Sequence, residues 1–352
     1  MAQFHSLNIK SIDKVTEKSV AITFDIPENL KEKFTFKAGQ YITLKTAING
    51  EDIRRDYSIC SSKQSGDLTV AVKSVENGTF SVYANEKLKA GDTIEVSEPN
   101  GRFVFEANAA KTRTIAAFAA GSGITPVLSI AKTLLEEEPF SNFILVYGNK
   151  SSEDTMFFKD LVNLQSLYGN RIHVHFIYSQ AKEEDALFGR IEKSIVNLIV
   201  KNKYKGVTIE NFYLCGPEQM IHTVKEVLIE NGVKEKAILF ELFTAPVEAE
   251  SGSNTETLSG NSKIKVLVDE EEFEFEMSKE QTILDAALKQ DIDAPYSCQG
   301  GICSSCIARV TEGEAKMRQN NILTDSEVAE GLVLTCQAHP TSDSLVVDYD
   351  DV

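Results

Sequence analysis

Four cysteines near the end of this 352-residue chain are the side chains best suited to metal or redox chemistry. Cys298, Cys303 and Cys306 lie within the stretch SCQGGICSSC, and Cys336 follows in VLTCQAHP. Thiols this close together serve four kinds of chemistry: disulfide bonds, a zinc site, a reactive dithiol or an iron–sulfur cluster. The context of the four cysteines has to decide among these.

The N-terminus makes a disulfide framework unfavourable. Residues 1–20 contain no basic segment followed by an apolar run, so we predict no secretory signal and a cytoplasmic protein with reduced thiols. The most apolar segment, 114–131, is interrupted by Gly121, Gly123 and Pro126, which predicts a strand, a turn and a helix instead of a membrane span. The formal net charge of −17 argues against a nucleic-acid partner, because phosphate contacts need a basic surface.

The spacing of the cysteines favours a cluster. C-x4-C-x2-C, followed after 29 residues by Cys336, is the spacing of a plant-type [2Fe–2S] site. Zinc, the alternative, usually takes two closely spaced ligand pairs, and His339 is the only rival for the missing ligand. A redox dithiol would be expected beside a thioredoxin-like pattern, which this region lacks. We expect the amides of Gly300 and Gly301 to point at the sulfurs.

The elements that must hold these residues fall into three patterns. The first hundred residues contain alternating apolar runs, among them 19–26, 40–46 and 67–75, which indicate an antiparallel β-barrel or sandwich. From about residue 112, strands and helices alternate, which indicates a parallel sheet with helices on both faces. The residues from 263 on read as a small α+β module that begins with a hairpin at 263–277.

A segment almost free of large apolar residues separates the last module from the rest. Residues 245–262 are rich in Ser, Gly, Thr, Asn and Glu, so we predict a linker there and domains at 1–108, 109–244 and 263–352. In the second domain we predict strands at 114–119, 142–148, 171–179 and 211–216, with helices around 125–138, 155–168 and 190–201 and after 216. In the third we predict a helix at 282–290 and a last strand at 344–350.

The motif RRDYSI is the first candidate binding site outside the cysteines. Arg55 could bind a pyrophosphate, the ring of Tyr57 could stack on a flat heterocycle, and the hydroxyl of Ser58 could bond to a ring nitrogen. The alternative is an ordinary exposed strand. In ENGTFS, Gly78 and Ser81 could hold a phosphate, with a hairpin turn at Asn77-Gly78 as the alternative.

Two later motifs lie where predicted strands end. The dinucleotide fingerprint G-x-G-x-x-G fails in AAGSGITP, because its last position is proline. A tight turn, a Thr cap and the free amides of a helix start still favour a pyrophosphate site, with a purely structural turn as the alternative. CGPEQM likewise places a small thiol, a glycine and a helix-starting proline at the end of a predicted strand, where such sheets bind ligands. The alternative is that Cys215 only fills buried space. The candidate binding residues of these motifs are Gly121, Ser122, Gly123, Thr125, Pro126, Gly216 and Pro217.

The residue that follows the second predicted strand of the α/β domain helps to distinguish NADPH from NADH. The strand ends in YGNK, without the acidic residue that an NAD ribose would favour. Lys150 could instead meet a 2′-phosphate, which tilts the prediction toward NADPH, with NADH still possible.

With these motifs in place, the chain resembles the ferredoxin–NADP reductase family with a fused C-terminal plant-type ferredoxin. The resemblance covers essentially the whole sequence. It rests on the R-x-Y-S motif, the Gly-x-x-Ser element, the glycine-rich loop, the C-G-P element and the LTCQA context of the fourth cysteine. It implies a flavin-binding antiparallel β-barrel, a nicotinamide-binding α/β domain and a β-grasp ferredoxin domain.

The resemblance also implies a route for electrons and the residues that serve it. Electrons would pass from NAD(P)H through FAD to the [2Fe–2S] cluster, and then to a di-iron oxygenase component or another one-electron acceptor protein. Ser58, Cys215 and Glu241 would be catalytic. Two departures stand out: Ser179-Gln180 replaces the Ser-Arg of NADPH-selective members, and Glu241 is followed by the linker instead of the chain end.

Three alternatives to an oxygenase reductase with FAD remain. The first is a general flavodoxin or ferredoxin reductase, and the second is a phthalate-type reductase that uses FMN. The third is a redox-sensing module without catalysis, which would require degraded motifs.

Overall fold

The computed structural model describes residues 3–243 and 260–352. Phe4–Phe243 forms one compact unit, and residues 260–352 belong to a second. Most of the predicted linker at 245–262 lies outside the described residues, and the second unit opens with a strand at Asn261. The predicted boundary at 108/109 falls inside the first unit and stays a prediction.

The first unit begins with a six-stranded antiparallel sheet that closes into a barrel. The strands are β1 (Phe4–Thr16), β2 (Ser19–Asp25), β3 (Tyr41–Ile48), β4 (Glu51–Ser58), β5 (Leu68–Lys73) and β6 (Thr93–Ser97). Their order is β4-β3-β6-β1-β2-β5, and a bridge between Ile59 and Val70 joins the two ends. Alternate side chains such as Leu7, Ile22 and Ile42 are fully buried inside, which is why the alternating runs predicted this fold.

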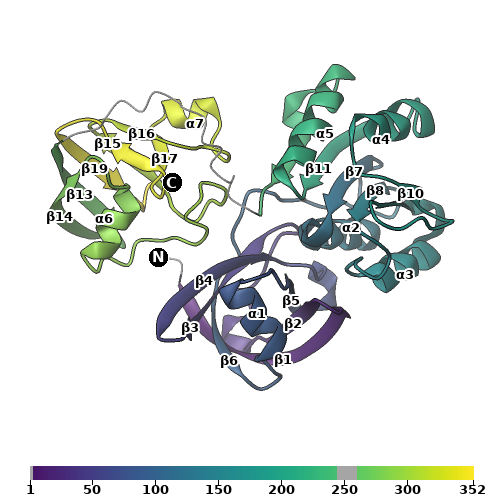
Figure 1. The fold of residues 1–352 in the computed structure, drawn as a ribbon, viewed down its shortest axis with the longest axis horizontal. Helices are drawn as coiled ribbons and strands as arrows, with labels where there is room; N and C mark the ends of the chain where they lie inside the picture. The colour runs from purple at the N-terminus through teal and green to yellow at the C-terminus, as the bar shows by residue number, and fades with distance from the viewer. Residues whose placement is uncertain (1–2, 244–259) are drawn as a thin grey trace. The chain divides into compact units, whose positions relative to one another are not determined.

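One helix in this barrel was not predicted from the sequence. α1 (Thr79–Glu86) begins directly after Gly78 and packs against β5 and β2 (Figure 1). Phe80 is 1% exposed and belongs to the barrel core, so its burial favours a helix over an exposed turn. The hairpin turn considered at Asn77-Gly78 is therefore wrong.

The rest of the first unit is a parallel sheet with helices on both faces. Its strands are β7 (Thr114–Ala120), β8 (Asn142–Asn149), β9 (Ile172–Tyr178), β10 (Leu187–Phe188), β11 (Ile209–Cys215) and β12 (Ile238–Glu241), in the order β10-β9-β8-β7-β11-β12. Its helices are α2 (Ile124–Glu137), α3 (Phe158–Tyr168), α4 (Lys193–Asn197) and α5 (Glu218–Glu230). Figure 1 shows α2 and α3 on one side of the sheet and α4 and α5 on the other.

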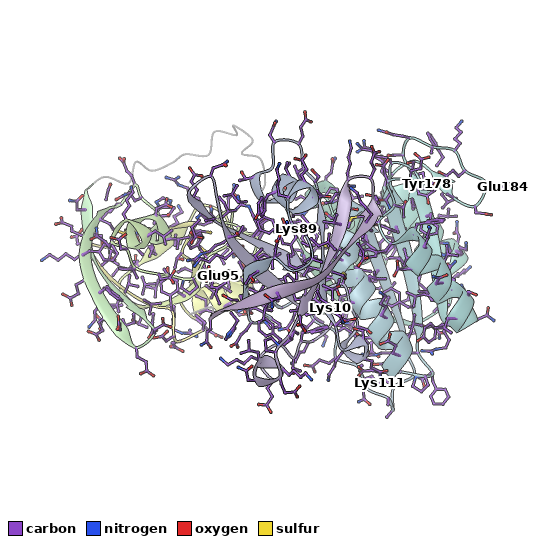
Figure 2. The ribbon with its side chains drawn as sticks, turned by 90° about the horizontal axis from the view of Figure 1, so that it is seen from below. Lys10, Lys89, Glu95, Lys111, Tyr178 and Glu184 are labelled. Atoms are coloured by element: carbon purple, nitrogen blue, oxygen red, sulfur yellow. The ribbon has the colours of Figure 1, made fainter. Side chains whose placement is uncertain are left out.

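The chain changes direction across this sheet between β7 and β11. From β7 it proceeds outward to β10 and then returns to the far side of β7, so the carboxyl ends of β7 and β11 flank a topological switch point. Figure 2 shows Tyr178, at the carboxyl end of β9, and Lys111, just before β7, on opposite sides of this domain. α4 is shorter than predicted because it continues as a π-helical turn at Leu198–Lys203.

Buried polar contacts hold the barrel and the parallel sheet together. Arg113, in the connection to β7, binds the fully buried carboxylate of Glu138 through two guanidinium nitrogens, at 2.6 and 3.0 Å. Ser141 donates to the same carboxylate at 2.7 Å, and Arg113 also donates to the carbonyl of Glu106, on the barrel side, at 2.9 Å. Across the joint, Tyr213 donates to the carbonyl of Val104 at 3.0 Å. The first unit therefore presents its two layers in one fixed arrangement.

The second unit is a mixed sheet crossed by a helix, as the α+β prediction required. The sheet contains β13 (Asn261–Val268), β14 (Glu271–Ser278), β15 (Ile307–Glu312), β17 (Leu332–Leu334) and β19 (Ser344–Asp348), in the order β14-β13-β19-β15-β17. A ribbon of β16 (Ala315–Met317) and β18 (Ala338–Pro340) and the helices α6 (Ile283–Lys289) and α7 (Asp325–Ala329) complete it. No helix in the described ranges is long and apolar enough to span a bilayer.

Candidate functional site

Three residues predicted to be catalytic come together where the barrel meets the parallel sheet. The hydroxyl of Ser58, at the end of β4, donates to Oε2 of Glu241 at 3.0 Å. Glu241 ends β12 and pairs directly with Cys215 at the end of β11. Ser58 and Cys215 are buried, and Glu241 is partly buried. The structure therefore brings side chains from three strands to one point at the carboxyl edge of the sheet.

The electrostatics of this point favour neutral groups at pH 7. Desolvation raises the pKa of Glu241 to about 8, and the charge of Asp56 adds to the effect, while the hydrogen bond from Ser58 opposes it. Desolvation, assisted by Glu241, raises the pKa of the Cys215 thiol well above its ordinary value. Glu241 is thus a protonated acid at neutral pH, and Cys215 is a thiol with no nucleophilic charge.

Tyr57 and Arg55 lie on the other face of β4 from Ser58. The Tyr57 ring packs against Phe80 with a centroid separation of 5.4 Å and remains partly exposed. The guanidinium of Arg55 is exposed and bonds to the carbonyl of Arg54 at 2.6 Å. The residues present thus fit a flavin nucleotide, with an aromatic face for the ring system and a planar cation for a pyrophosphate.

Gly78 and Ser81 form the start of α1. A β-carbon on Gly78 would overlap the hydroxyl oxygen of Ser81, which itself accepts from the amide of Val75 at 3.1 Å. The absence of a side chain at Gly78 makes room for the hydroxyl of Ser81 at the first turn of α1, and the amides of a helix start can bind anions. The arrangement is compatible with the predicted phosphate role of both residues, which stays a prediction.

The glycine-rich motif forms a short 3-10 turn, Gly121–Gly123, between β7 and α2. Gly121 has a φ of +56°, a conformation that favours glycine. A β-carbon on Gly123 would overlap the carbonyl of Cys215, so the C-G-P element packs against this turn and leaves no room for a side chain there. Thr125 was expected to cap α2, and that expectation is wrong: its hydroxyl donates to the carbonyl of Ser122 at 3.0 Å, and Gly123 is the N-cap.

The sequence motifs missed a lysine that faces the glycine-rich turn. Apart from Gly121 and its two chain neighbours, the only atom of the described residues within 4 Å of the position that a β-carbon of Gly121 would take is Nζ of Lys73, 3.9 Å away. Desolvation lowers the pKa of Lys73, Asp154 opposes this, and the charge of Lys150 lowers it further. One cation, Lys73, therefore faces the turn, and a second, Lys150, lies near enough to lower its pKa, which fits a phosphate group. Lys73 is a single lysine at the end of β5 and belongs to no sequence motif, so the sequence alone did not indicate it.

The remaining predicted nicotinamide residues lie at the same edge of the sheet. Lys150 follows β8 and is exposed, and its carbonyl accepts from the amide of Gln180 at 2.9 Å. Gly216 lies against Ala120, and Pro217 is the N-cap of α5. Gly216 and Pro217 border the switch point between β7 and β11, where doubly wound sheets bind ligands, and Lys150 lies one strand farther out, after β8.

The four cysteines predicted as ligands belong to the second unit. Cys306 and Cys336 are buried, whereas Cys298 and Cys303 are partly exposed in a segment, 290–306, without helix or strand. The hydrogen bond with Cys336, together with burial, raises the pKa of the Cys306 thiol, so these two sulfurs are adjacent although 30 positions separate them in sequence.

Backbone amides accompany the sulfurs, as predicted from the glycines. Gly300 donates its amide to Sγ of Cys298 at 3.4 Å, and the amide of Gly301 lies close enough to Cys336 to lower the pKa of that thiol, after the larger effect of Cys306. Gly301 has a φ of +70°. Amides directed at sulfur stabilise thiolate charge, which is what an iron–sulfur cluster requires of its loop.

Across residues 3–243 and 260–352, no three His, Cys, Asp or Glu side chains gather closely enough to hold a single metal ion. A [2Fe–2S] cluster does not need such a group, because each of its two irons takes two of the four cysteines. Soft thiolate ligands with amide donors around them fit this cluster chemically.

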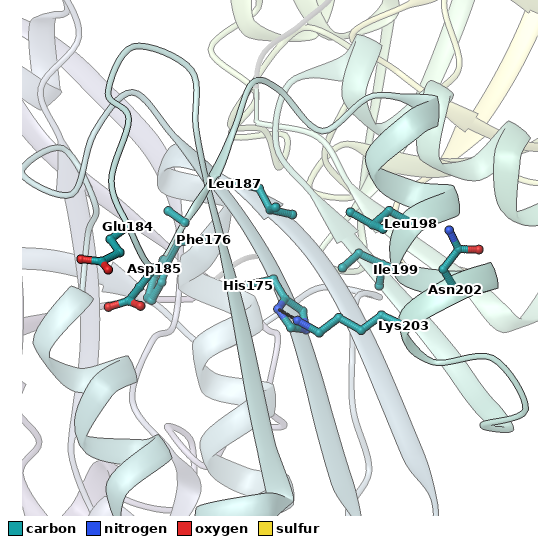
Figure 3. Close-up of a pocket in the computed structure, with 10 residues that line it drawn as sticks. His175, Phe176, Glu184, Asp185, Leu187, Leu198, Ile199, Asn202 and Lys203 are labelled. Atoms are coloured by element: carbon teal, nitrogen blue, oxygen red, sulfur yellow. Dashed lines mark hydrogen bonds between the residues drawn. The ribbon is translucent and has the colours of Figure 1, made fainter.

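A cavity of about 520 Å³ lies elsewhere, between β9 and the π-helical turn (Figure 3). Lys203 reaches His175 from the wall opposite the strand, at 3.3 Å between Nζ and Nδ1. Burial and this positive charge lower the pKa of His175 to about 4. None of the residues predicted for catalysis or binding lines this cavity among the described residues.

Comparison with known families agrees with the three-part organisation. The model of an oxidoreductase FAD-binding domain matches residues 6–105, that of an oxidoreductase NAD-binding domain matches 118–226, and that of a 2Fe-2S iron-sulfur cluster binding domain matches 266–341. Each match covers the corresponding candidate residues, except Glu241, which lies beyond the NAD-binding match.

Two curated relatives and one solved structure extend over nearly the whole chain. One of the subunits of the 1,2-phenylacetyl-CoA epoxidase of Escherichia coli K12 is 38% identical over 99% of both chains. The ferredoxin reductase component of 3-ketosteroid-9-alpha-monooxygenase from Rhodococcus rhodochrous is 28% identical over 97% of this chain and 96% of its own. The structure of phthalate dioxygenase reductase, at 25% identity, covers 98% of both chains with a TM-score of 0.61.

Proposed function

Because the chain belongs to the family of oxygenase reductases that includes this Escherichia coli epoxidase protein, we propose that it supplies electrons to a phenylacetyl-CoA epoxidase. As a member of this family it is an oxidoreductase, the electron-transfer component of an oxygenase system, with FAD-binding, NAD-binding and [2Fe–2S] domains. The match of an FAD-binding domain to residues 6–105 disfavours the FMN alternative.

The residues divide the work according to their positions. When bound, FAD accepts an electron pair as hydride from NAD(P)H and releases electrons singly, and the [2Fe–2S] cluster carries them one at a time. Arg55 and the amides before Ser81 bind phosphate, and Tyr57 orients the ring system. The Gly121–Gly123 turn with Lys73 and Lys150 binds the dinucleotide phosphates.

The 38% identity to the epoxidase subunit carries the proposed partner, and the contact between Ser58 and Glu241 supports hydride transfer at this site. At neutral pH the carboxyl of Glu241 holds a proton, and its Oε2 accepts from the Ser58 hydroxyl at 3.0 Å. This pair can give or take a proton at the edge of the flavin site, which suits hydride transfer. Cys215, a neutral thiol beside Glu241, is 0% exposed and belongs to the hydrophobic core, which favours the alternative that it fills buried space behind the site.

The central experiment is anaerobic reduction of the purified full-length protein. We expect a visible spectrum with flavin and [2Fe–2S] absorption together, and bleaching of both when NADPH or NADH is added. Absence of bleaching with either nucleotide would contradict the reductase function. The ratio of kcat/KM for the two nucleotides then tests the preference for NADPH proposed from Lys150, with Lys150→Ala expected to remove that preference.

The identity of the acceptor needs a second experiment. The proposed partner is the di-iron oxygenase component of the epoxidase, and the general flavodoxin reductase is the competing function. We expect NAD(P)H consumption to depend on phenylacetyl-CoA when the purified oxygenase component is present, and to be faster than reduction of flavodoxin. Normal cytochrome c reduction without substrate-dependent turnover would favour the general reductase.

A further inference from the structure

The hydroxyl of Tyr147 reaches the glycine-rich turn from underneath. Tyr147 lies on β8, is 0% exposed and pairs with Ala119 on β7, two residues before the turn begins. Its hydroxyl donates to the carbonyl of Gly121 at 2.9 Å. Desolvation raises the pKa of Tyr147, so this hydroxyl stays protonated and can always donate.

Two donors therefore share the carbonyl of Gly121. The amide of Ile124, at the start of α2, and the hydroxyl of Tyr147 both bond to it. A carbonyl oxygen has two lone pairs, so both are used inside the protein and the carbonyl is directed toward the strands. The peptide amides of the turn, which would bind an anion, are then left for the opposite side.

The other end of the turn is limited by packing. Gly123 lies so close to the carbonyl of Cys215 that a β-carbon would overlap it. The Gly123 end is held by backbone contact with Cys215, and the Gly121 end by the amide of Ile124 and the one side-chain hydrogen bond from Tyr147. The conformation at Gly121 matters, since it adopts a φ of +56° and faces Lys73.

The same hydroxyl also lies near a second segment at this edge. The carbonyl of Met156, in the connection from β8 to α3, is 3.4 Å away, at the limit of a hydrogen bond. This connection begins with Lys150, the residue proposed for the nucleotide phosphate. A phenylalanine would fill the same core space, so packing alone does not account for a hydroxyl at this buried position.

We propose that Tyr147 is a positioning residue for NAD(P)H, whose hydroxyl holds the Gly121–Gly123 turn in its phosphate-binding conformation without touching the nucleotide. This rests on the function proposed above, in which that turn binds the dinucleotide. Tyr147 thereby sets the affinity for NAD(P)H and leaves the rate of hydride transfer to Ser58 and Glu241.

The test is Tyr147→Phe in the full-length holoprotein, which keeps the ring and removes only the hydroxyl. We expect the KM for the preferred nucleotide and the dissociation constant of its oxidised form, from flavin difference spectra, to rise about tenfold, the equivalent of one hydrogen bond. We expect kcat to change by less than about twofold. Flavin and iron content should equal those of the unmodified protein.

Tyr213→Phe is the matched control. Tyr213 lies in the same sheet, is 4% exposed and donates to a backbone carbonyl, that of Val104, at 3.0 Å, away from the glycine-rich turn. We expect the two variants to lose similar thermal stability, with KM unchanged in Tyr213→Phe.

Two results would overturn the inference. One is an unchanged KM and dissociation constant in Tyr147→Phe, and the other is an equal rise in both variants, which would mean a general loss of rigidity. If the unmodified protein were not bleached by NAD(P)H, the proposed function itself would fail. Normal bleaching with an unchanged KM in Tyr147→Phe would reject only the role of Tyr147.

Discussion

The site proposed for hydride transfer lies between regular elements, whereas the cysteine loop proposed for the cluster lies in irregular chain. Ser58, Cys215 and Glu241 each end a strand, and their contacts follow from strand pairing and one hydrogen bond. The segment 290–306 has neither helix nor strand, and Gly300 bonds to the sulfur of a proposed ligand, Cys298.

The difference indicates where each site obtains its order. Burial and sheet hydrogen bonds of the first unit fix the hydride site before any cofactor binds, which lowers the cost of binding. In the cysteine loop the sulfurs would bind iron only as thiolates, so cluster binding would be coupled to their deprotonation and would supply much of the order. The first site is made by folding, and the second is completed by its cofactor.

Replacing a proposed cluster ligand is expected to have the largest effect, because it should separate the activities of the two sites. In Cys336→Ser we expect cytochrome c reduction to fall at least about a hundredfold, while NAD(P)H-dependent reduction of a two-electron dye stays within about twofold. The reason is that the flavin in the first unit needs no cluster to accept a hydride. Stopped-flow and steady-state assays measure both activities.

Cys60→Ser provides the control for this prediction. Cys60 is a buried cysteine of the barrel whose sulfur bonds to the carbonyl of Thr69, so a hydroxyl can replace it. Both activities should survive in that variant. Equal loss of both activities in Cys336→Ser would mean that the cysteines support the structure of the whole protein and that the two sites are not independent.

Breaking the buried ion pair at the barrel joint should disturb the first unit alone. Glu138→Ala removes the buried partner of Arg113 and leaves it the ion pair with Glu210 at 2.8 Å, so the lost hydrogen bonds cost about 1–3 kcal/mol. We expect a lower melting temperature, measured by calorimetry, and weaker flavin retention, measured by flavin fluorescence. The circular dichroism of the [2Fe–2S] centre should not change, and a parallel loss of that signal would contradict the independence of the units.

Glu241→Gln tests whether the Ser58–Glu241 pair takes part in proton transfer. We expect hydride transfer to the flavin to slow about 10- to 100-fold, the usual contribution of one acid–base group. In the unmodified protein the rate should change with pH near 8, the pKa of Glu241, and in the variant this inflection should vanish. Anaerobic stopped-flow measurements across the neutral and mildly alkaline range would show it; an identical inflection in both proteins would assign it to another group.

The same carboxyl predicts a pH effect on stability. Its pKa in the folded protein, about 8, is raised from 4.5, so the folded state holds the proton over a range in which the unfolded chain has lost it. The stability contributed by Glu241 is therefore complete below about pH 4.5 and declines as the pH rises toward 8. In urea unfolding, the free energy of the unmodified protein should fall relative to that of Glu241→Gln as the pH rises through this range. A constant or growing difference in favour of the unmodified protein would show that this sign is wrong.

The smallest expected effect concerns the second unit. Thr324 caps α7 by accepting from the amide of Glu327 at 3.3 Å, in a full capping box. Thr324→Ala should cost about 1 kcal/mol, seen as a lower midpoint in denaturant with the cluster present. If cluster binding dominates the order of this unit, the variant protein without iron should be destabilised far more visibly than the holoprotein.

Much of the fold could be predicted from local patterns. Alternating runs such as 19–26 predicted barrel strands because one face of each strand is buried, and the switch to alternating strands and helices predicted the parallel sheet. The cysteine spacing predicted a cluster because the ligands of one loop must be close in sequence. Strand alternation and cysteine spacing both depend on residues that are close in sequence, so both can be read from the sequence.

The rest depends on contacts between distant segments. α1 was missed because its polar residues resemble a turn, and only the burial of Phe80 in the barrel selects the helix. Glu241 was named through family resemblance, since nothing in its local sequence indicates that it meets Ser58. Lys73 gave no motif at all, because its role arises from its approach to Gly121 across the joint.

The hydrogen bond between Ser58 and Glu241 joins residues 183 positions apart, which bears on how the protein matures. During synthesis, the proton site cannot exist until nearly all of the first unit has left the ribosome and closed a long loop. The four cysteines span only residues 298–336 and can gather locally. A truncated nascent chain would therefore have a nearly complete barrel and still be chemically inert, so reactive reduced flavin would form only after the first unit is complete.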